Sequence, residues 1–387
     1  MKTKLMILGV IVFVAHAAVA QTLSKSNIVA KKDPSGTIIC DYSKVSTKTI
    51  EIPLSELVES LEIVLLDAAD DALVANTHAI VSDNYILIKG SDNNPYKLFD
   101  KKGKFIAKIG SVGQGPGEYN LIYDAQIDEK NKRIYLLPWQ SDKLLAFDFT
   151  GKALAPYPLA ARLSKGKFKV NDDKTITLAT LPFKGWTKYV VWNQTLDGKV
   201  NNGIDAGKYA IDPDFSNEVF ANKNVNTFDF ALFMFWGENR DWFNYNYKTN
   251  DLKVAFKMNF GNIETPITSY GELPLHYLAN FAEPKKVSEN TTVTQNHRFL
   301  IVDKKTMKGS YYSFKNDFLG DIPFQWANFE NGYYVNNSDP GDLKDALEKA
   351  LNENKNMSKS MKEKVTKLKN SITDNDNNYI IYGKLKR

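Results

Sequence analysis

The stretch KLFDKKGKFIAKIG, residues 97–110, decides the fold, because the chain repeats its plan twice. Residues 144–156 (LLAFDFTGKALAP) and 189–200 (YVVWNQTLDGKV) follow the same order: an apolar strand, a polar turn with Gly-Lys, and a second strand. The glycines of the three turns are spaced 48 and 47 residues apart, at Gly103, Gly151 and Gly198. Two further strand-like runs precede each copy, so one unit is a four-stranded antiparallel sheet of about 50 residues.

A unit of this size cannot bury both faces of its sheet alone, whereas stacking such units in a ring buries them against one another. Fainter units continue the rhythm. We expect a fourth from strands at 228–235, 241–247 and 252–260, a fifth from 291–294, 297–302 and 309–314, and a sixth that opens with 324–329 and 332–336. The sequence therefore predicts an all-β fold, a six-bladed β-propeller with four-stranded antiparallel blades.

The ring also needs a closure. Two strand-like runs, 48–53 and 61–66, precede the first unit and have no blade of their own. We expect an N-terminal strand to complete the last blade beside residues 377–385, which removes free sheet edges and joins both ends of the chain. The alternative is two domains divided near 207–214, but the strand rhythm crosses that point unbroken.

One segment breaks the strand pattern near the C-terminus, at residues 339–372. Asp339 and Pro340 suit the N-cap and first position of a helix, and apolar residues then recur at helical spacing. We therefore predict a helical insertion in the last blade. The lysines of this segment are interpreted as its solvated polar face.

The N-terminus has the form of an export signal. Lys2 and Lys4 precede an apolar run over residues 5–20 that ends in Ala-Val-Ala. The alternative, a transmembrane anchor, needs a longer uninterrupted run. We predict a signal peptide at 1–20, an N-terminal arm at 21–47 and the propeller at 48–387. No cysteine follows the apolar run, so the protein is predicted to be periplasmic or secreted, without a lipid or membrane anchor.

Composition excludes several classes of function. The formal net charge of +5 falls to +3 without the two signal lysines, too little for a nucleic-acid-binding surface. Cys40 is the single cysteine, which excludes an intramolecular disulfide and a cysteine-based metal site. The four histidines form no ligand motif. We predict no cofactor, with calcium held by Asp and Asn as the open alternative.

Several stretches resemble a known family. They are LSELVESLEIVLL at 54–66, FDKKGKFI at 99–106, and above all GQGPGEY at 113–119. These look like the six-bladed β-propeller proteins exported by Bacteroidetes, and the wider fold resembles NHL-type propellers. The run DNDNN at 374–378 is similar to the closing segment of those proteins. The resemblance implies the propeller fold and an envelope location, and it implies no established reaction.

Aromatic residues recur in loops that the propeller would place on one rim. The loops between second and third strands read WQSD at 139–142, FKGWT at 183–187 and WGENRDW at 236–242. Aromatic faces beside amides and charges suit a carbohydrate or peptide ligand. The candidate ligand-binding residues are Trp139, Gln140, Trp186, Trp236, Arg240 and Trp242, with Gln114 and Glu118 of the Gly-rich loop.

Each of these residues has a structural alternative. The tryptophans can instead seal contacts between blades, and the Gly-rich loop can pack Glu118 and Tyr119 between the first two blades. Trp192 and Trp326 fall inside expected strands and are predicted to lie in the core. His78 is the histidine nearest a central funnel.

We therefore predict a monomeric, exported binding module for a glycan, a peptide or an envelope protein. One alternative is a metal-assisted lyase or hydrolase with its site in the central funnel, which rests on fold analogy. The other is a scaffold that docks a partner on residues 339–372. No Gly-x-Ser-x-Gly motif is present, and no catalytic residue is assigned.

Overall fold

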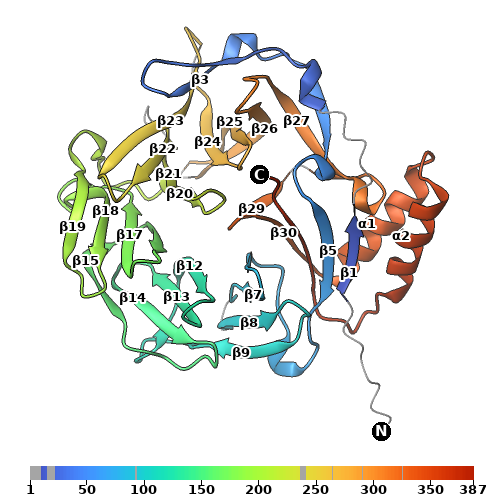
Figure 1. Ribbon diagram of the computed structural model, residues 1–387, viewed down its shortest axis with the longest axis horizontal. Helices are drawn as coiled ribbons and strands as arrows, with labels where there is room; N and C mark the ends of the chain where they lie inside the picture. Colours follow the sequence, from blue (N-terminus) through green and yellow to red (C-terminus); the bar gives the residue numbers. More distant parts are fainter. Residues whose placement is uncertain are drawn as a thin grey trace.

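Six sheets surround a central axis in the computed structural model of the chain (Figure 1). The structure describes residues 10–14, 22–91, 94–235, 241–263, 265–289, 291–324 and 326–387. Five of these sheets contain four antiparallel strands in chain order from the axis outward, and the sixth combines three C-terminal strands with one strand from the N-terminal part of the chain. Some sheets carry additional strands at their outer edges. The prediction of a six-bladed β-propeller is therefore confirmed.

The first three blades are the three clear sequence repeats. Blade one contains β6 (Ala79–Val81), β7 (Tyr85–Ile88), β8 (Tyr96–Asp100) and β9 (Phe105–Ile109). Blade two contains β12 (Ile122–Asp128), β13 (Arg133–Pro138), β14 (Ser141–Asp148) and β15 (Tyr157–Leu163). Blade three contains β16 (Gly166–Val170), β17 (Thr175–Thr180), β18 (Tyr189–Thr195) and β19 (Val200–Asp205). Trp192 is buried in β18, as predicted.

The repeated Asp and Gly residues have a geometric cause. Asp148 ends β14, and its carboxylate accepts hydrogen bonds from the backbone N–H groups of Thr150 and Lys152 at 2.9 and 3.1 Å. Gly151 then takes a φ of +83°, and a Cβ atom there would lie 1.8 Å from the carbonyl oxygen of Lys108 in the neighbouring blade. The turn therefore requires glycine both for its backbone angle and for the close approach between blades.

The last three blades are the fainter repeats. Blade four contains β20 (Glu218–Asn222), β21 (Phe228–Phe233), β22 (Trp242–Asn246) and β23 (Asp251–Asn259). Blade five contains β24 (Ile267–Glu272), β25 (His276–Ser288), β26 (Thr291–Asp303) and β27 (Gly309–Asn316), with β28 (Ile322–Phe324) paired to β27. Blade six contains β29 (Asn328–Glu330), β30 (Tyr333–Ser338) and β31 (Tyr379–Lys384).

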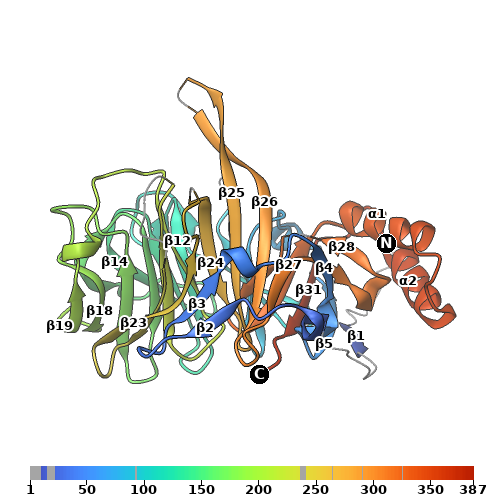
Figure 2. The ribbon, with the colours of Figure 1, turned by 90° about the horizontal axis from the view of Figure 1, so that it is seen from above.

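Two predictions for these blades are wrong. Residues 291–294 and 297–302 form one strand, β26, which pairs with the equally long β25 in a hairpin that rises above the ring (Figure 2). Residues 324–329 are divided, because β28 belongs to blade five and β29 begins blade six. The outer half of the long hairpin stands in solvent, so its sequence shows little of the apolar alternation by which buried strands are recognised.

The ring closes as predicted. β5 (Ser60–Leu65) is antiparallel to β31 and supplies the fourth strand of blade six. Before it, β3 (Ile38–Asp41) and β4 (Thr49–Pro53) run parallel to β23 and β27, on the outside of blades four and five. β2 (Ala30–Lys32) pairs with β3. β1 (Val10–Val14), which falls within the predicted signal peptide at 1–20, pairs with the outer edge of β5.

The helical insertion lies between β30 and β31, on the outside of blade six (Figures 1 and 2). It consists of α1 (Pro340–Glu353) and α2 (Lys359–Ser371). The Asp339 side chain accepts a hydrogen bond from the N–H of Asp342 at 2.9 Å, which confirms the predicted N-cap. Leu347 and Val365 are buried in the hydrophobic cluster of blades five and six. No helix in the described ranges is long and apolar enough to cross a membrane.

Polar side chains cap the inner strand edges that face the axis. Asp124 accepts a hydrogen bond from the N–H of Phe168 at 2.9 Å, so blade two satisfies an edge group of blade three. Asn331 donates to the carbonyl of Val81 at 2.9 Å and joins blade six to blade one in the same way. These bonds satisfy backbone groups that the four-stranded sheets leave unpaired.

Candidate ligand site

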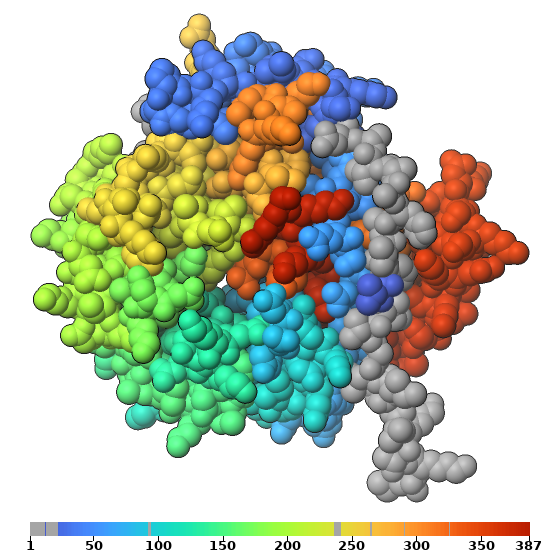
Figure 3. Space-filling model, in the orientation of Figure 1, coloured from blue at the N-terminus to red at the C-terminus, as the bar shows by residue number. Residues whose placement is uncertain are grey.

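The two faces of the ring differ. The connections between successive blades and between the second and third strands lie on one face, from which the β25–β26 hairpin rises (Figure 2). We call it the hairpin face. The opposite face carries the C-terminal residues near its centre and is the one seen in Figure 3. The predicted rim loops at 139–142 and 183–187 belong to the hairpin face.

A cavity of about 400 Å³ opens where blades six and one meet. We call it the Trp326 pocket, because its most exposed aromatic side chain is that of Trp326, at 64%. The prediction that Trp326 lies in the core is wrong, since it stands in the connection between β28 and β29. Its other lining residues are Thr77, His78, Ala79, Ala327, Asn328, Tyr334, Val335, Asn336 and Asn337.

Two rings from blade five hold the indole of Trp326 in place. The His297 ring lies 5.0 Å from it between centroids, and the Phe299 ring lies 4.9 Å away, both edge-to-face. His297 and Phe299 project from β26, the strand that continues into the raised hairpin. The indole is therefore positioned by neighbouring rings while much of its surface remains open to solvent.

His78 is the polar group of the pocket with the best-defined state. Its Nδ1 lies 3.1 Å from Nδ2 of Asn328. The amide nitrogen can only donate, so Nδ1 accepts and Nε2 carries the ring proton. Desolvation by the surrounding strands, and then the charges of Lys167 and Lys89, lower the pKa of His78 to about 4. The imidazole is therefore neutral at neutral pH and offers an N–H donor.

The wall behind His78 is fixed by the C-terminal segment. Asn337 donates to the carbonyls of Ala75 and Thr77, both at 2.9 Å. Asn377 accepts from the N–H of Val74 at 3.1 Å, and Asn378 donates to the side-chain oxygen of Asn337 at 2.8 Å. The DNDNN run thus has a structural use, because its last two residues hold the connection between β5 and β6.

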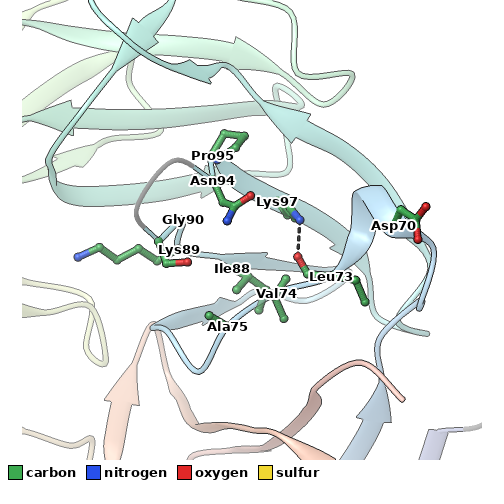
Figure 4. Close-up of a pocket in the computed structure, with 11 residues that line it drawn as sticks. Asp70, Leu73, Val74, Ala75, Ile88, Lys89, Gly90, Asn94, Pro95 and Lys97 are labelled. Atoms are coloured by element: carbon green, nitrogen blue, oxygen red, sulfur yellow. Dashed lines mark hydrogen bonds between the residues drawn. The ribbon is translucent and has the colours of Figure 1, made fainter. Parts of the chain in front are cut away.

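A second cavity, of about 350 Å³, lies on the other side of that connection (Figure 4). Lys97 is buried beneath it, and its ammonium group donates to the carbonyl of Leu73. Lys89 also lines this cavity, but Figure 4 shows its side chain directed away from Leu73 and Lys97. Leu73 is half-exposed, at 49%. The connection therefore separates two adjacent pockets of the hairpin face.

The structure exposes two of the predicted rim tryptophans. Trp139 is 41% exposed between β13 and β14, and Trp186 is 47% exposed between β17 and β18. Trp186 packs edge-to-face on Phe183 with 5.3 Å between ring centroids. The neighbouring Gln140 has a φ of +50°, and its carbonyl accepts from Nε of Arg162 at 2.8 Å. Trp139 and Trp186 thus belong to blades two and three, away from the blades that form the Trp326 pocket.

The third predicted loop contributes differently. Trp242 is 1% exposed at the start of β22, and its indole N–H donates to Oε2 of Glu272 at 2.6 Å. A side chain enclosed in this way is not available to stack on a ligand at the rim, so the assignment of Trp242 as a rim residue is corrected. Trp236 and Arg240 lie outside the described residues.

The Gly-rich loop is filled by its own carboxylate. Oε2 of Glu118 accepts from the N–H of Gly115 at 2.8 Å. Tyr119 is buried, where its hydroxyl donates to the carbonyl of Ile109 at 2.6 Å and accepts from the N–H of Tyr96 at 2.8 Å. These contacts agree with the structural alternative, in which the loop joins blades one and two. Gln114 is exposed at its tip.

Charged side chains gather around the central axis. Lys223 forms an ion pair with Asp124 at 3.2 Å, and Lys165 forms one with Glu218 at 3.1 Å. Burial raises the pKa of Glu330 to about 7. Among the residues described, no three His, Cys, Asp or Glu side chains are arranged to hold a metal ion. The axis is thus lined by two ion pairs, by the carboxyl group of Glu330 and by edge-capping groups.

Fold and site together define a six-bladed β-propeller with a tryptophan-lined pocket on one face. The chain belongs to the family described as a domain of unknown function, DUF4934, which matches residues 37–384. Comparison with curated proteins found no significant match.

Two solved structures are similar to this chain over most of their length. A presumed exported protein of Bacteroides fragilis has a TM-score of 0.57 and 16% identity, over 88% of this chain and 98% of its own. A member of the DUF4221 family from Bacteroides vulgatus has a TM-score of 0.42 and 13% identity, over 85% and 97%. The first similarity supports the fold.

Proposed function

We propose that the protein is an exported binding module that recognises a carbohydrate in the Trp326 pocket. The observation that carries the proposal is the solvent-exposed indole of Trp326, held by His297 and Phe299 above a pocket of amides. Sugar rings have apolar C–H faces that stack on flat aromatic rings, and hydroxyl groups that need donors and acceptors. The pocket supplies both.

The surrounding polar groups support the same class of ligand. Asn328, Asn336 and Asn337 line the cavity, and the neutral His78 adds an N–H donor. Part of this set is already ordered, since Asn337 and Asn328 are held by hydrogen bonds within the protein. A preorganised set of polar groups reduces the entropy lost on binding. Export is supported by the signal-like N-terminus and by the presumed export of the Bacteroides fragilis protein.

A glycan array probed with purified protein tests the proposal. Trp326→Ala is the main variant, and Trp326→Phe restores a smaller aromatic face. We expect the alanine variant to weaken binding by about tenfold or more, equal to about 1.4 kcal/mol, with partial recovery in the phenylalanine variant. Trp186→Ala, on blade three, is the matched exposed-aromatic control and should bind as the wild type does.

Other results would reject the proposed site. If Trp186→Ala or Trp139→Ala abolishes binding while Trp326→Ala does not, the ligand lies on the rim of blades two and three. If the array is silent and a peptide library yields the ligand, the carbohydrate assignment is wrong.

A further inference from the structure

A half-buried lysine stands beside the Trp326 pocket without a carboxylate to balance it. Lys89 follows β7, and its backbone N–H donates to the carbonyl of His78 at 2.8 Å. Within the described ranges its ammonium group forms no ion pair. Burial, and then the charge of Lys167, lower the pKa of Lys89. Burial and the positive charge of Lys167 therefore both disfavour the charged form of Lys89.

Lys167 extends the positive region toward the axis. It lies at the start of β16, and its ammonium group donates to the carbonyl of Tyr123 at 3.1 Å. A carbonyl group has no net charge, so this hydrogen bond does not neutralise the positive charge of Lys167. The charges of Lys167 and Lys89 both lower the pKa of His78, and the charge of Lys167 also lowers the pKa of Lys89, so the two ammonium groups lie near this imidazole and near each other.

The carboxyl groups near these lysines are either paired with another lysine or protonated in a fraction of the molecules at neutral pH. Asp124 is paired with Lys223 at 3.2 Å and also accepts from the N–H of Phe168. Glu330, on β29, has a pKa raised to about 7 by burial. Positive charge is therefore in excess at the mouth of the axis on the hairpin face. An arrangement of this kind attracts an anion and gains free energy when one binds.

We infer that the ligand is an acidic carbohydrate, whose sugar ring lies on Trp326 and whose carboxylate lies between the ammonium groups of Lys89 and Lys167. His78 joins the two parts of this site, because it lines the Trp326 pocket and its carbonyl is bonded to the backbone of Lys89. The inference rests on the proposed function and adds the charge of the ligand to it.

The test compares oligosaccharides that differ only in charge. The probes are oligogalacturonate and oligomannuronate fragments and the same fragments with their carboxyl groups reduced to alcohols. Binding is measured by calorimetry at low and at physiological ionic strength. We expect the wild type to prefer an acidic fragment over its reduced form by about tenfold, and the preference to shrink as salt is added.

Variants assign the preference to the two lysines. Lys89→Gln and Lys167→Gln should each bring the acidic-to-neutral affinity ratio close to one and leave the affinity for the reduced fragment unchanged. Lys89→Arg should keep most of the preference, because it keeps the charge. Lys362→Gln, on the exposed side of α2, removes a charge far from the pocket and is the matched control.

The outcomes separate this inference from the proposed function. If neutral glycans bind through Trp326 and acidic fragments bind no better, or if Lys89→Gln keeps the preference, the inference is overturned and the proposed function stands. If neither acidic nor neutral oligosaccharides bind, both are wrong.

Discussion

Lys223 of blade four and Asp124 of blade two meet across the axis of the ring, with 3.2 Å between Nζ and Oδ2. The two side chains are 12% and 13% exposed, so the ion pair is largely removed from water. The same carboxylate accepts a hydrogen bond from Phe168 of blade three. Asp124 therefore connects three blades.

Removal of this carboxylate should destabilise the ring. Asp124→Ala removes the only carboxylate paired with Lys223 among the described residues and leaves the N–H of Phe168 without its acceptor. We expect a loss of about 3 kcal/mol in the free energy of unfolding. Asp212→Ala is the control, because its pair with Lys184 is exposed and should contribute less than about 0.5 kcal/mol. Urea denaturation measures both. An equal loss of unfolding free energy in the two variants would show that the axial ion pair stabilises the protein no more than an exposed one does.

Gly151 should tolerate no side chain. Gly151→Ala combines a positive φ with a Cβ position 1.8 Å from a backbone oxygen, and we expect a loss of 3 kcal/mol or more, taking ~1–3 kcal/mol for the backbone alone. Gly185 has a φ of +75° and nothing within 4 Å of its Cβ position. Gly185→Ala should therefore lose only the smaller, backbone contribution. Thermal unfolding of both variants separates strain from steric clash, and similar shifts would contradict the close approach between blades.

Cys40 should be unreactive in the folded protein. It is fully buried in β3, and burial raises the pKa of its thiol to about 12. Since the thiolate is the reactive form, a thiol reagent should label it only after unfolding. The measurement is the labelling rate with and without denaturant. Fast labelling of the native protein would mean that the arm carrying β3 detaches from blade four.

Stability should fall as the pH rises through neutrality. Glu330 and Asp229 have pKa values raised to about 7, mainly by burial, from 4.5 and 3.8. The folded state therefore holds protons that the unfolded state has released, and its stabilisation is lost as the pH rises toward and above 7. His276 and His78 act in the opposite direction, since desolvation lowers their pKa values to about 4, and their effect continues until an unfolded histidine, with a pKa of about 6.5, has lost its proton.

Denaturant unfolding of the wild type and of carboxyl variants at about pH 6.5 and about pH 8 isolates the carboxyl effect, because the histidines contribute equally to all of these proteins. Glu330→Gln should have a smaller drop in stability between these two values than the wild type has. Asp229→Asn provides a second, independent comparison. An unchanged drop in both variants would show that other groups cause the dependence.

The periodic spacing of strands and turns was enough to predict the ring, because the features that produce this spacing depend on short stretches of sequence. The turn at Gly151, the N-cap at Asp339 and the closure by residues 61–66 each follow from residues that are close in sequence or from the need to pair a strand edge. The repeats of blades four to six lack such clear turn and strand signals. β20 and β24 were not predicted, because Glu218–Asn222 and Ile267–Glu272 have polar residues that cap neighbouring edges or pair with charges inside the ring. β25 was also not predicted, because the outer half of His276–Ser288 is exposed and polar.

The candidate site depended on contacts that sequence patterns do not encode. Trp326 and Trp242 both lie near the boundary between a loop and a strand, yet one is exposed and the other is buried. Their environments are decided by partners on other strands, namely Phe299 for Trp326 and Glu272 for Trp242. The isolated His78 gave one usable signal, through its position just before an innermost strand.

The closure of blade six also determines when the molecule can fold. Ile63 pairs with Ile381, so the last sheet contains strands from both ends of the chain. Contacts between such distant positions form late and slowly, because a long loop must close before they form. A chain that has not yet reached Tyr379 can assemble its first blades but must leave an open edge at each end of the row. Folding of the ring therefore has to wait for the complete polypeptide, and every C-terminal truncation before β31 should yield an open, association-prone product.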